Sequence, residues 1–159
     1  MDDMKGLLLI GFKGRNNLSC RLVEQLSRDY RLLTNSASGL KKDIGSVDPA
    51  YECVVLFGVD KNLPGTLRIE GRAEKDGEVC CSLLSLEKTA DCFRDAGLTA
   101  EVSVTPTSWL CNEAYWHLLR KFSGRAVLVH IPTMKNADGG LIPKVQQALS
   151  AWETEAYTL

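Results

Sequence analysis

The sequence predicts an α/β domain in which helices cover both faces of a mostly parallel central sheet of about five to six strands, giving three layers. Two observations lead to this fold class: short apolar runs recur along the chain, and amphipathic segments with helical spacing lie between them. A third is that no internal repeat, low-complexity tract or interdomain linker interrupts this alternation. We therefore expect residues 1–159 to form one domain.

The predicted strands are of two kinds. Residues 7–12 and 53–58 are apolar throughout, as is typical of strands that are buried on both faces. The strand expected at residues 67–71 alternates apolar with charged residues, which is typical of a strand with one exposed face. The predicted strands span residues 7–12, 30–34, 53–58, 67–71, 100–104 and 126–131.

The predicted helices have apolar residues three or four positions apart. Ser19 is placed to cap the first helix, which we expect to end near Tyr30. Residues 35–49 are rich in Ser, Gly, Asp and Lys, so we interpret them mainly as a loop with room for one helical turn. The remaining predicted helices span residues 85–96, 111–122 and 141–152.

Composition and charge exclude several classes of protein. The chain is 45% hydrophobic and 25% charged, which is typical of a globular domain that needs neither disulfides nor metals to fold. The net charge of −1 provides no basic field, so we expect neither nucleic acid nor a membrane as a partner.

The start of the chain and the cysteines indicate a cytoplasmic protein. Residues 6–12 are too short to span a bilayer, and no basic leader precedes them. We therefore expect six reduced thiols. With no CxxC pair and two histidines, we predict no metal site. The cysteines are Cys20, Cys53, Cys80, Cys81, Cys92 and Cys111.

Cys111 and His130 are the residues whose positions indicate chemistry. Cys111 lies where residues 105–112 lead from a strand into a helix, and a helix N-terminus lowers the pKa of a thiol. His130 lies at the end of the next predicted strand. If the two strands are adjacent and parallel, the side chains meet and can form a nucleophile and its base. From these residues alone, a buried structural thiol and a core histidine remain open alternatives.

Three stretches of the chain resemble the signatures of the pyroglutamyl peptidase I family of cysteine peptidases. Residues 102–119, VSVTPTSWLCNEAYWHLL, are similar to the segment around that family's nucleophile. Residues 128–132, LVHIP, resemble its strand ending in His-Ile/Val-Pro, and residues 69–73, IEGRA, resemble its Glu-Arg-x-Ala motif. The opening residues 5–12 also resemble the start of the family, so the resemblance covers most of the chain.

This resemblance implies a catalytic triad and a substrate. Cys111 would be the nucleophile, His130 its base, and Glu70 the group that orients the imidazole. The enzyme would remove N-terminal pyroglutamate, or a similar small acyl group, from a small peptide or acyl amide without a cofactor. The resemblance also implies that the chain can form a homo-oligomer. The residues implied to bind the substrate are Phe12, Trp109 and Leu110.

The chain departs from the family after Glu70. The family has a longer loop there, with an arginine that contributes to the oxyanion site, whereas residues 73–77 of this chain are too short for such a loop. Arg68 and Arg72 are the residues that could replace this arginine. The departure keeps a second hypothesis open, in which the chain is a catalytically degenerate relative that acts as a binding or assembly module.

Overall fold

The structure is a computed structural model that describes residues 4–107 and 109–155. Its main element is a six-stranded sheet in the order β2-β1-β3-β8-β4-β7. Four of the five strand pairings are parallel, and only the pairing of β4 with β8 is antiparallel. The strands are β1 (Lys5–Phe12), β2 (Asp29–Leu33), β3 (Tyr51–Val59), β4 (Leu67–Glu70), β7 (Ala100–Ser103) and β8 (Ala126–Ile131).

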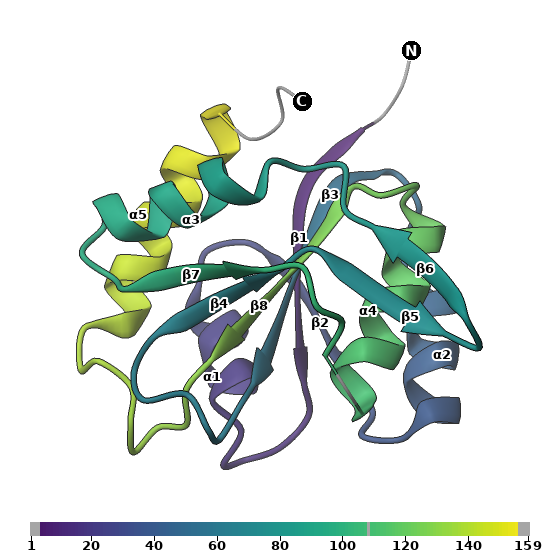
Figure 1. Cartoon of the computed structure of the whole chain (residues 1–159), viewed down its shortest axis with the longest axis horizontal. Helices are drawn as coiled ribbons and strands as arrows, with labels where there is room; N and C mark the ends of the chain where they lie inside the picture. The colour runs from purple at the N-terminus through teal and green to yellow at the C-terminus, as the bar shows by residue number, and fades with distance from the viewer. Residues whose placement is uncertain (1–3, 108, 156–159) are drawn as a thin grey trace.

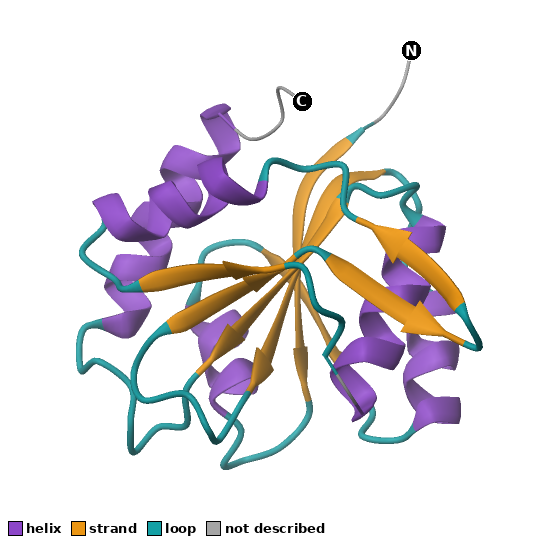
Figure 2. Cartoon of the chain, viewed as in Figure 1, coloured by secondary structure: helices purple, strands orange, loops and turns teal. Residues whose placement is uncertain are grey.

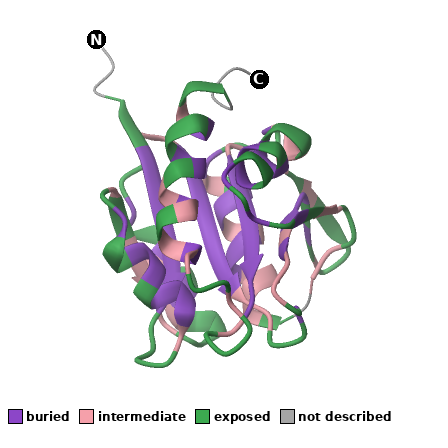
Figure 3. Cartoon of the chain, turned by 90° about the vertical axis from the view of Figure 1, so that its left-hand side faces the viewer, coloured by how far each residue is buried: buried purple, intermediate pink, exposed green. Residues whose placement is uncertain are grey.

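Helices cover both faces of this sheet, as Figure 1 shows, and the predicted three-layer α/β class is confirmed. One apolar cluster joins the sheet to α1, α3 and α5, and a second joins the opposite face to α2 and α4. In Figure 3 the central strands are buried while the outer faces of the helices are exposed. None of the helices in the described part of the chain combines the length and apolarity that crossing a bilayer requires. The helices are α1 (Leu18–Gln25), α2 (Ala37–Gly45), α3 (Leu86–Asp95), α4 (Trp109–Lys121) and α5 (Leu141–Glu155).

The start of α1 differs from the prediction. Asn17 is the N-cap, and its side chain accepts a hydrogen bond from the backbone N–H of Ser19. Ser19 lies inside the helix and is fully buried, and its hydroxyl accepts a hydrogen bond of 3.0 Å from the backbone N–H of Phe12. Ser19 thus joins α1 to the end of β1 instead of capping the helix. The helix ends at Gln25, so that Tyr30 lies on β2.

The prediction of a loop over residues 35–49 was wrong, because this segment contains α2. Ser36 caps the helix by accepting a hydrogen bond from the backbone N–H of Gly39. Leu40 and Ile44, four residues apart, are both buried against the sheet. Two apolar residues at helical spacing therefore outweigh a composition that is otherwise typical of loops.

A small hairpin beside α4 was also not predicted. The strands β5 (Arg72–Lys75) and β6 (Glu78–Cys81) pair antiparallel as a separate two-stranded sheet. Asp76 and Gly77 join them, with φ angles of 52° and 80°. Asp-Gly favours such a turn because both positions require positive φ. Figure 1 places the hairpin beside α4, the helix that carries Cys111.

Candidate active site

A pocket with a volume of about 650 Å³ lies at the carboxyl ends of β3 and β8. Figure 2 shows the loops that follow these strands gathered at one edge of the sheet, where ligands bind in open α/β proteins. The lining comes from β8, from β3 and the loop after it, and from the segment that leads into α4. The lining residues are Val59, Asp60, Lys61, Asn62, Thr107, Trp109, Leu110, Cys111 and His130.

The pairing of β4 with β8 brings Glu70 to His130. Arg68 lies directly opposite His130, and Glu70 lies two residues further along β4. Residues two apart on a strand face the same side, so all three side chains share one face of the sheet. His130 Nδ1 lies 2.7 Å from Glu70 Oε2, and the two side chains are only 3% and 1% exposed. Their contact is therefore a buried carboxylate–imidazole hydrogen bond.

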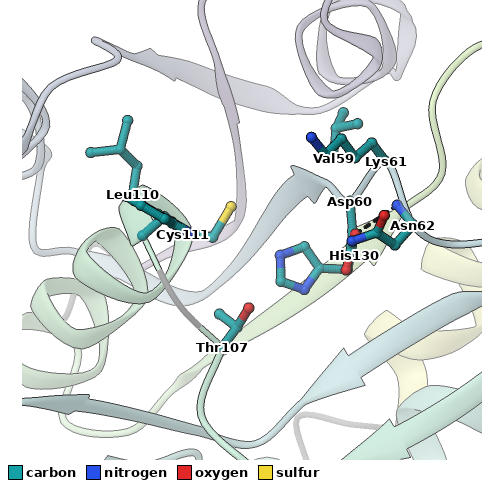
Figure 4. Close-up of a pocket in the computed structure, with 9 residues that line it drawn as sticks. Val59, Asp60, Lys61, Asn62, Thr107, Leu110, Cys111 and His130 are labelled. Atoms are coloured by element: carbon teal, nitrogen blue, oxygen red, sulfur yellow. Dashed lines mark hydrogen bonds between the residues drawn. The ribbon is translucent and has the colours of Figure 1, made fainter.

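This contact determines which ring nitrogen of His130 faces the pocket as a base. An ionised carboxylate only accepts hydrogen bonds, so Nδ1 carries the proton and donates it to Glu70. In the neutral ring, Nε2 is then unprotonated. Figure 4 shows the His130 ring and the Cys111 sulfur pointing toward one another across the pocket.

Gly58 provides the space between these two side chains. It pairs with His130 in the parallel register of β3 and β8. A Cβ atom at Gly58 would lie 2.6 Å from Cys111 Sγ and 3.5 Å from His130 Nε2. The sulfur and the nitrogen therefore border the same small volume. The described residues show no hydrogen bond from Cys111 to His130, so proton transfer requires a rotation of the thiol. Loose contacts of this kind are common in unliganded active sites.

Arg68 links the Glu70–His130 pair to a second carboxylate. Its Nε donates to Glu70 Oε2 at 3.1 Å, and its Nη2 donates to Asp60 Oδ2 at 2.7 Å. Burial acts to raise the pKa of Glu70, but hydrogen bonds and charge from His130 and Arg68 outweigh it and lower that pKa. Burial also acts to raise the pKa of Asp60, and its bonds to Arg68 and the Asn62 N–H lower it instead. Both carboxylates are thus ionised at neutral pH.

The Cys111 thiol is neutral at neutral pH. Burial, together with the negative charges of Asp60 and Glu70, raises the pKa of Cys111 to about 12, and Arg68 opposes this effect only in part. The expected lowering of this pKa by the helix N-terminus was wrong, because desolvation of the thiolate outweighs the favourable dipole. To act as a nucleophile, Cys111 would therefore need a base that takes its proton.

Several solved structures that match this architecture are peptidases. Pyroglutamyl peptidase I from Bacillus amyloliquefaciens matches with a TM-score of 0.74 and 17% identity, covering 98% of this chain and 96% of that chain. Pyrrolidone carboxyl peptidase from Thermus thermophilus matches with a TM-score of 0.72 and 18% identity, covering 90% and 98%. Pyrrolidone carboxyl peptidase from Thermococcus litoralis matches with a TM-score of 0.72 and 19% identity, covering 92% of this chain and 92% of that chain. The chain has the pyroglutamyl peptidase I fold. No protein-family model and no curated protein matches the sequence.

Within the pyroglutamyl peptidase I fold, Cys111 reaches His130 by a different route from the one predicted. The strands before them are not adjacent and parallel, because β4 lies between β7 and β8 and runs antiparallel to β8. The chain after β7 leads back to the carboxyl ends of β3 and β8, where α4 begins at Trp109 (Figure 1). Ser108, part of the predicted strand-to-helix turn, lies outside the described residues. A connecting segment, and not strand adjacency, thus places the sulfur.

Hydrogen bonds to the hairpin and to β4 hold the first two turns of α4 in place. The Asn112 side chain accepts a hydrogen bond from the Glu74 N–H at 3.0 Å and donates one to the Glu74 carbonyl at 2.7 Å. The Tyr115 hydroxyl donates to the Glu70 carbonyl at 2.7 Å. The hairpin and β4 therefore both hold the helix that carries Cys111.

The predicted substrate-binding residues fall into two groups. Trp109 and Leu110 line the pocket, and Trp109 is 89% exposed. Phe12 is only 4% exposed and packs in the apolar cluster beneath α2 and α4. It is not among the residues that line the pocket. In this fold the aromatic side chain available to a substrate at the pocket is that of Trp109.

Two residues of the site were missed by sequence reasoning. Gly58 ends an otherwise bulky apolar run, and Asp60 follows the end of a buried strand, so both carried a signal. Of the two candidate arginines, Arg68 lies beside His130, whereas Arg72 is exposed on β5. Among the described residues, no three His, Cys, Asp or Glu side chains are grouped so as to hold a metal ion.

Proposed function

We propose that this chain is a cysteine hydrolase that removes a small acyl group, with N-terminal pyroglutamate as the first candidate, from a peptide or acyl amide. One observation carries the proposal: Glu70 holds Nδ1 of His130 at 2.7 Å, so that Nε2 faces Cys111 at the wall of a pocket. A nucleophile, its base and a group that orients the base are the parts that acyl transfer requires. The choice of acyl group is supported by the pyroglutamyl and pyrrolidone carboxyl peptidases that share the fold.

The proposed reaction follows from the protonation states. His130 Nε2 takes the proton from Cys111 as the sulfur attacks the substrate carbonyl. The resulting imidazolium is stabilised by ionised Glu70 and then protonates the departing amine. Water, deprotonated by the same nitrogen, hydrolyses the thioester and releases the acid. Backbone N–H groups in the first turn of α4 lack partners within the helix, so they can bind the negative oxygen of the intermediate.

The test is hydrolysis of a chromogenic pyroglutamyl amide by the wild type and by Cys111→Ser and Cys111→Ala. We expect both variants to lose turnover, and we expect mass spectrometry of the quenched wild type to show an acyl adduct on Cys111. The exposed Cys81, changed to serine, is the matched control and should keep full activity. Turnover that survives in Cys111→Ala contradicts the proposal. A wild type that hydrolyses none of the acyl amides tried faster than the uncatalysed background also contradicts it.

A second candidate function is a binding or assembly module that has kept the fold without catalysis. The neutral Cys111 thiol and its missing hydrogen bond to His130 favour this alternative. A module of this kind would bind a pyroglutamyl peptide in calorimetry without consuming it. Its affinity would not change in Cys111→Ala, whereas a hydrolase would consume the peptide only with Cys111 present.

A further inference from the structure

Arg68 contacts three titratable side chains near Cys111. Its guanidinium bonds to Glu70 and Asp60, and its Nη2 also lies 3.3 Å from His130 Nδ1. We propose that Arg68 and Asp60 are positioning residues of the proposed hydrolase. Asp60 holds the guanidinium so that His130 gives its Nδ1 proton to Glu70 and presents an unprotonated Nε2 to Cys111. The inference rests on the proposed function and assigns two residues to it.

The reasoning starts from the two neighbours of His130 Nδ1, which make opposite demands. Glu70 Oε2, at 2.7 Å, can only accept a hydrogen bond, whereas Arg68 Nη2, at 3.3 Å, can only donate one. If Nδ1 donates to Glu70, Nε2 is free to act as a base. If Nδ1 instead accepts from Arg68, the proton of the neutral ring lies on Nε2, which then cannot take a proton from Cys111. The two neighbours therefore select between an active and an inactive tautomer.

Asp60 decides this competition in favour of Glu70. Its Oδ2 accepts from Arg68 Nη2 at 2.7 Å, a shorter contact than the one from Nη2 to the ring. Its Oδ1 accepts from the backbone N–H of Asn62 at 2.9 Å, which fixes the carboxylate. Asp60 therefore takes one of the two Nη2 hydrogens and fixes the plane of the guanidinium, so that the contact from Nη2 to His130 stays the longer one while Nε holds Glu70 in place.

The charges around the ring support the same assignment. Glu70 and Arg68 reach His130 from β4, Asp60 from the loop after β3, and the neutral Cys111 from α4. Two carboxylates and one guanidinium leave one net negative charge behind the imidazole, which favours the imidazolium formed when His130 takes the thiol proton.

The test is ring ¹⁵N NMR titration of His130, together with the pH profile of kcat/KM. The sequence has two histidines, so a His117→Gln sample assigns the signals. We expect the Nδ1–H tautomer in the wild type. Asp60→Ala should move neutral His130 toward the Nε2–H tautomer, because Arg68 can then donate to Nδ1, whereas Arg68→Met should keep the Nδ1–H tautomer. Each variant should lower kcat about tenfold, a part of the roughly 10²–10⁴-fold effect of a general base.

Arg94→Met is the matched control, because Arg94 also contacts two carboxylates, Glu87 and Asp91, but lies on α3. It should change neither the tautomer nor the profile. The inference is overturned if Asp60→Ala leaves the tautomer of His130 unchanged, or if Arg68→Met also moves it to Nε2–H. If Arg68→Met does not fold, the tautomer in Asp60→Ala decides alone. If the wild type shows no turnover, the proposed function fails, while the NMR result still decides the roles of Arg68 and Asp60.

Discussion

The missing side chain of Gly58 leaves the space on β3 in which the Cys111 sulfur and the His130 ring lie. It lies inside a strand and does not have a positive φ angle, so its backbone conformation does not require glycine. What requires glycine is the volume in front of it, which the sulfur and the imidazole share. The smallest residue of the site therefore limits its geometry.

Gly58→Ala should lower kcat by about 100-fold, because a displacement of about 1 Å at a reacting atom can cost that much. The added methyl group would lie 2.6 Å from Cys111 Sγ, and the sulfur must move away. Steady-state kinetics on the acyl amide check this. Gly45→Ala is the control, because a Cβ at Gly45 meets nothing within 4 Å. Unchanged kcat in Gly58→Ala would show that the sulfur reacts from another position.

Alkylation of Cys111 by iodoacetamide should be slow at neutral pH and should accelerate about tenfold per pH unit toward pH 11, since the thiolate is the nucleophile. The sign follows from the pKa of about 12: below it the thiol stays protonated, and raising the pH increases the thiolate fraction. Peptide mapping by mass spectrometry measures the rate. The exposed Cys81 serves as the internal comparison and should react first. Preferential labelling of Cys111 at pH 7 would contradict the neutral thiol.

The candidate residues Cys111 and His130 could be picked out from the sequence because the motifs around them are local. Cys111 precedes Asn112 at a helix start, and His130 precedes Ile131 and Pro132 at a strand end. Asp60 could not be assigned in this way, because its contact with Arg68 forms between a loop and a strand. The pKa of Cys111 was predicted in the wrong direction, since a sequence shows the helix start but not the burial of the thiol.

At the scale of elements, the β5–β6 hairpin acts as a support for α4. Its edge offers the backbone of Glu74, to which Asn112 bonds as a neighbouring strand would. Lys75 forms an ion pair with Glu113 of α4 at 2.6 Å, which adds a second attachment. The position of Cys111 therefore depends on a hairpin that does not itself line the pocket.

Asn112→Asp should destabilise the fold by about 1–2 kcal/mol, because one hydrogen bond is lost and a carboxylate is placed against the Glu74 carbonyl. It should also lower kcat by loosening the first turn of α4. Urea unfolding and kinetics measure the two effects. Asn35→Asp is the matched control, since the Asn35 amide donates to one exposed carbonyl, that of Lys13. Equal losses of stability and of kcat in the two variants would show that Asn112 has no particular role in holding α4.

Helices and strands could be predicted where local apolar residues determine them. They could not be predicted where pairing with a distant segment determines the structure. β1, β3 and β8 were recognised because each is an apolar run. The direction of β4 could not be read from residues 67–70, because strand direction depends on which neighbour a strand pairs with. The hairpin carried a local Asp-Gly signal, but its strands are mostly polar and were not recognised.

At the scale of the whole molecule, two apolar clusters on opposite faces of the sheet hold the layers together. The site lies on the face covered by α2 and α4, whereas α5 stabilises the other face. Trp152 of α5 is 1% exposed, and its Nε1–H donates to the Thr89 hydroxyl at 2.8 Å. The cytoplasmic location and the homo-oligomer expected from the sequence stay predictions.

Trp152→Ala should lower the free energy of unfolding by about 3–5 kcal/mol, as is usual for a buried aromatic side chain. The exposed Trp109, changed to alanine, should alter it by no more than about 0.5 kcal/mol. Guanidinium unfolding of the three proteins measures the difference. If Trp109 contacts the substrate, its loss should raise KM instead. Similar destabilisation by both changes would contradict the assigned burial.

The insertion of β4 between β7 and β8 also bears on how the molecule is made. Glu70 and His130 are 60 residues apart in the chain, so the carboxylate leaves the ribosome long before its imidazole partner is synthesised. Closing such a distant pairing is slow compared with forming local helices. A nascent or refolding chain therefore gains much of its helix content before Glu70 and His130 can meet, and a fragment that stops before residue 126 lacks the imidazole altogether.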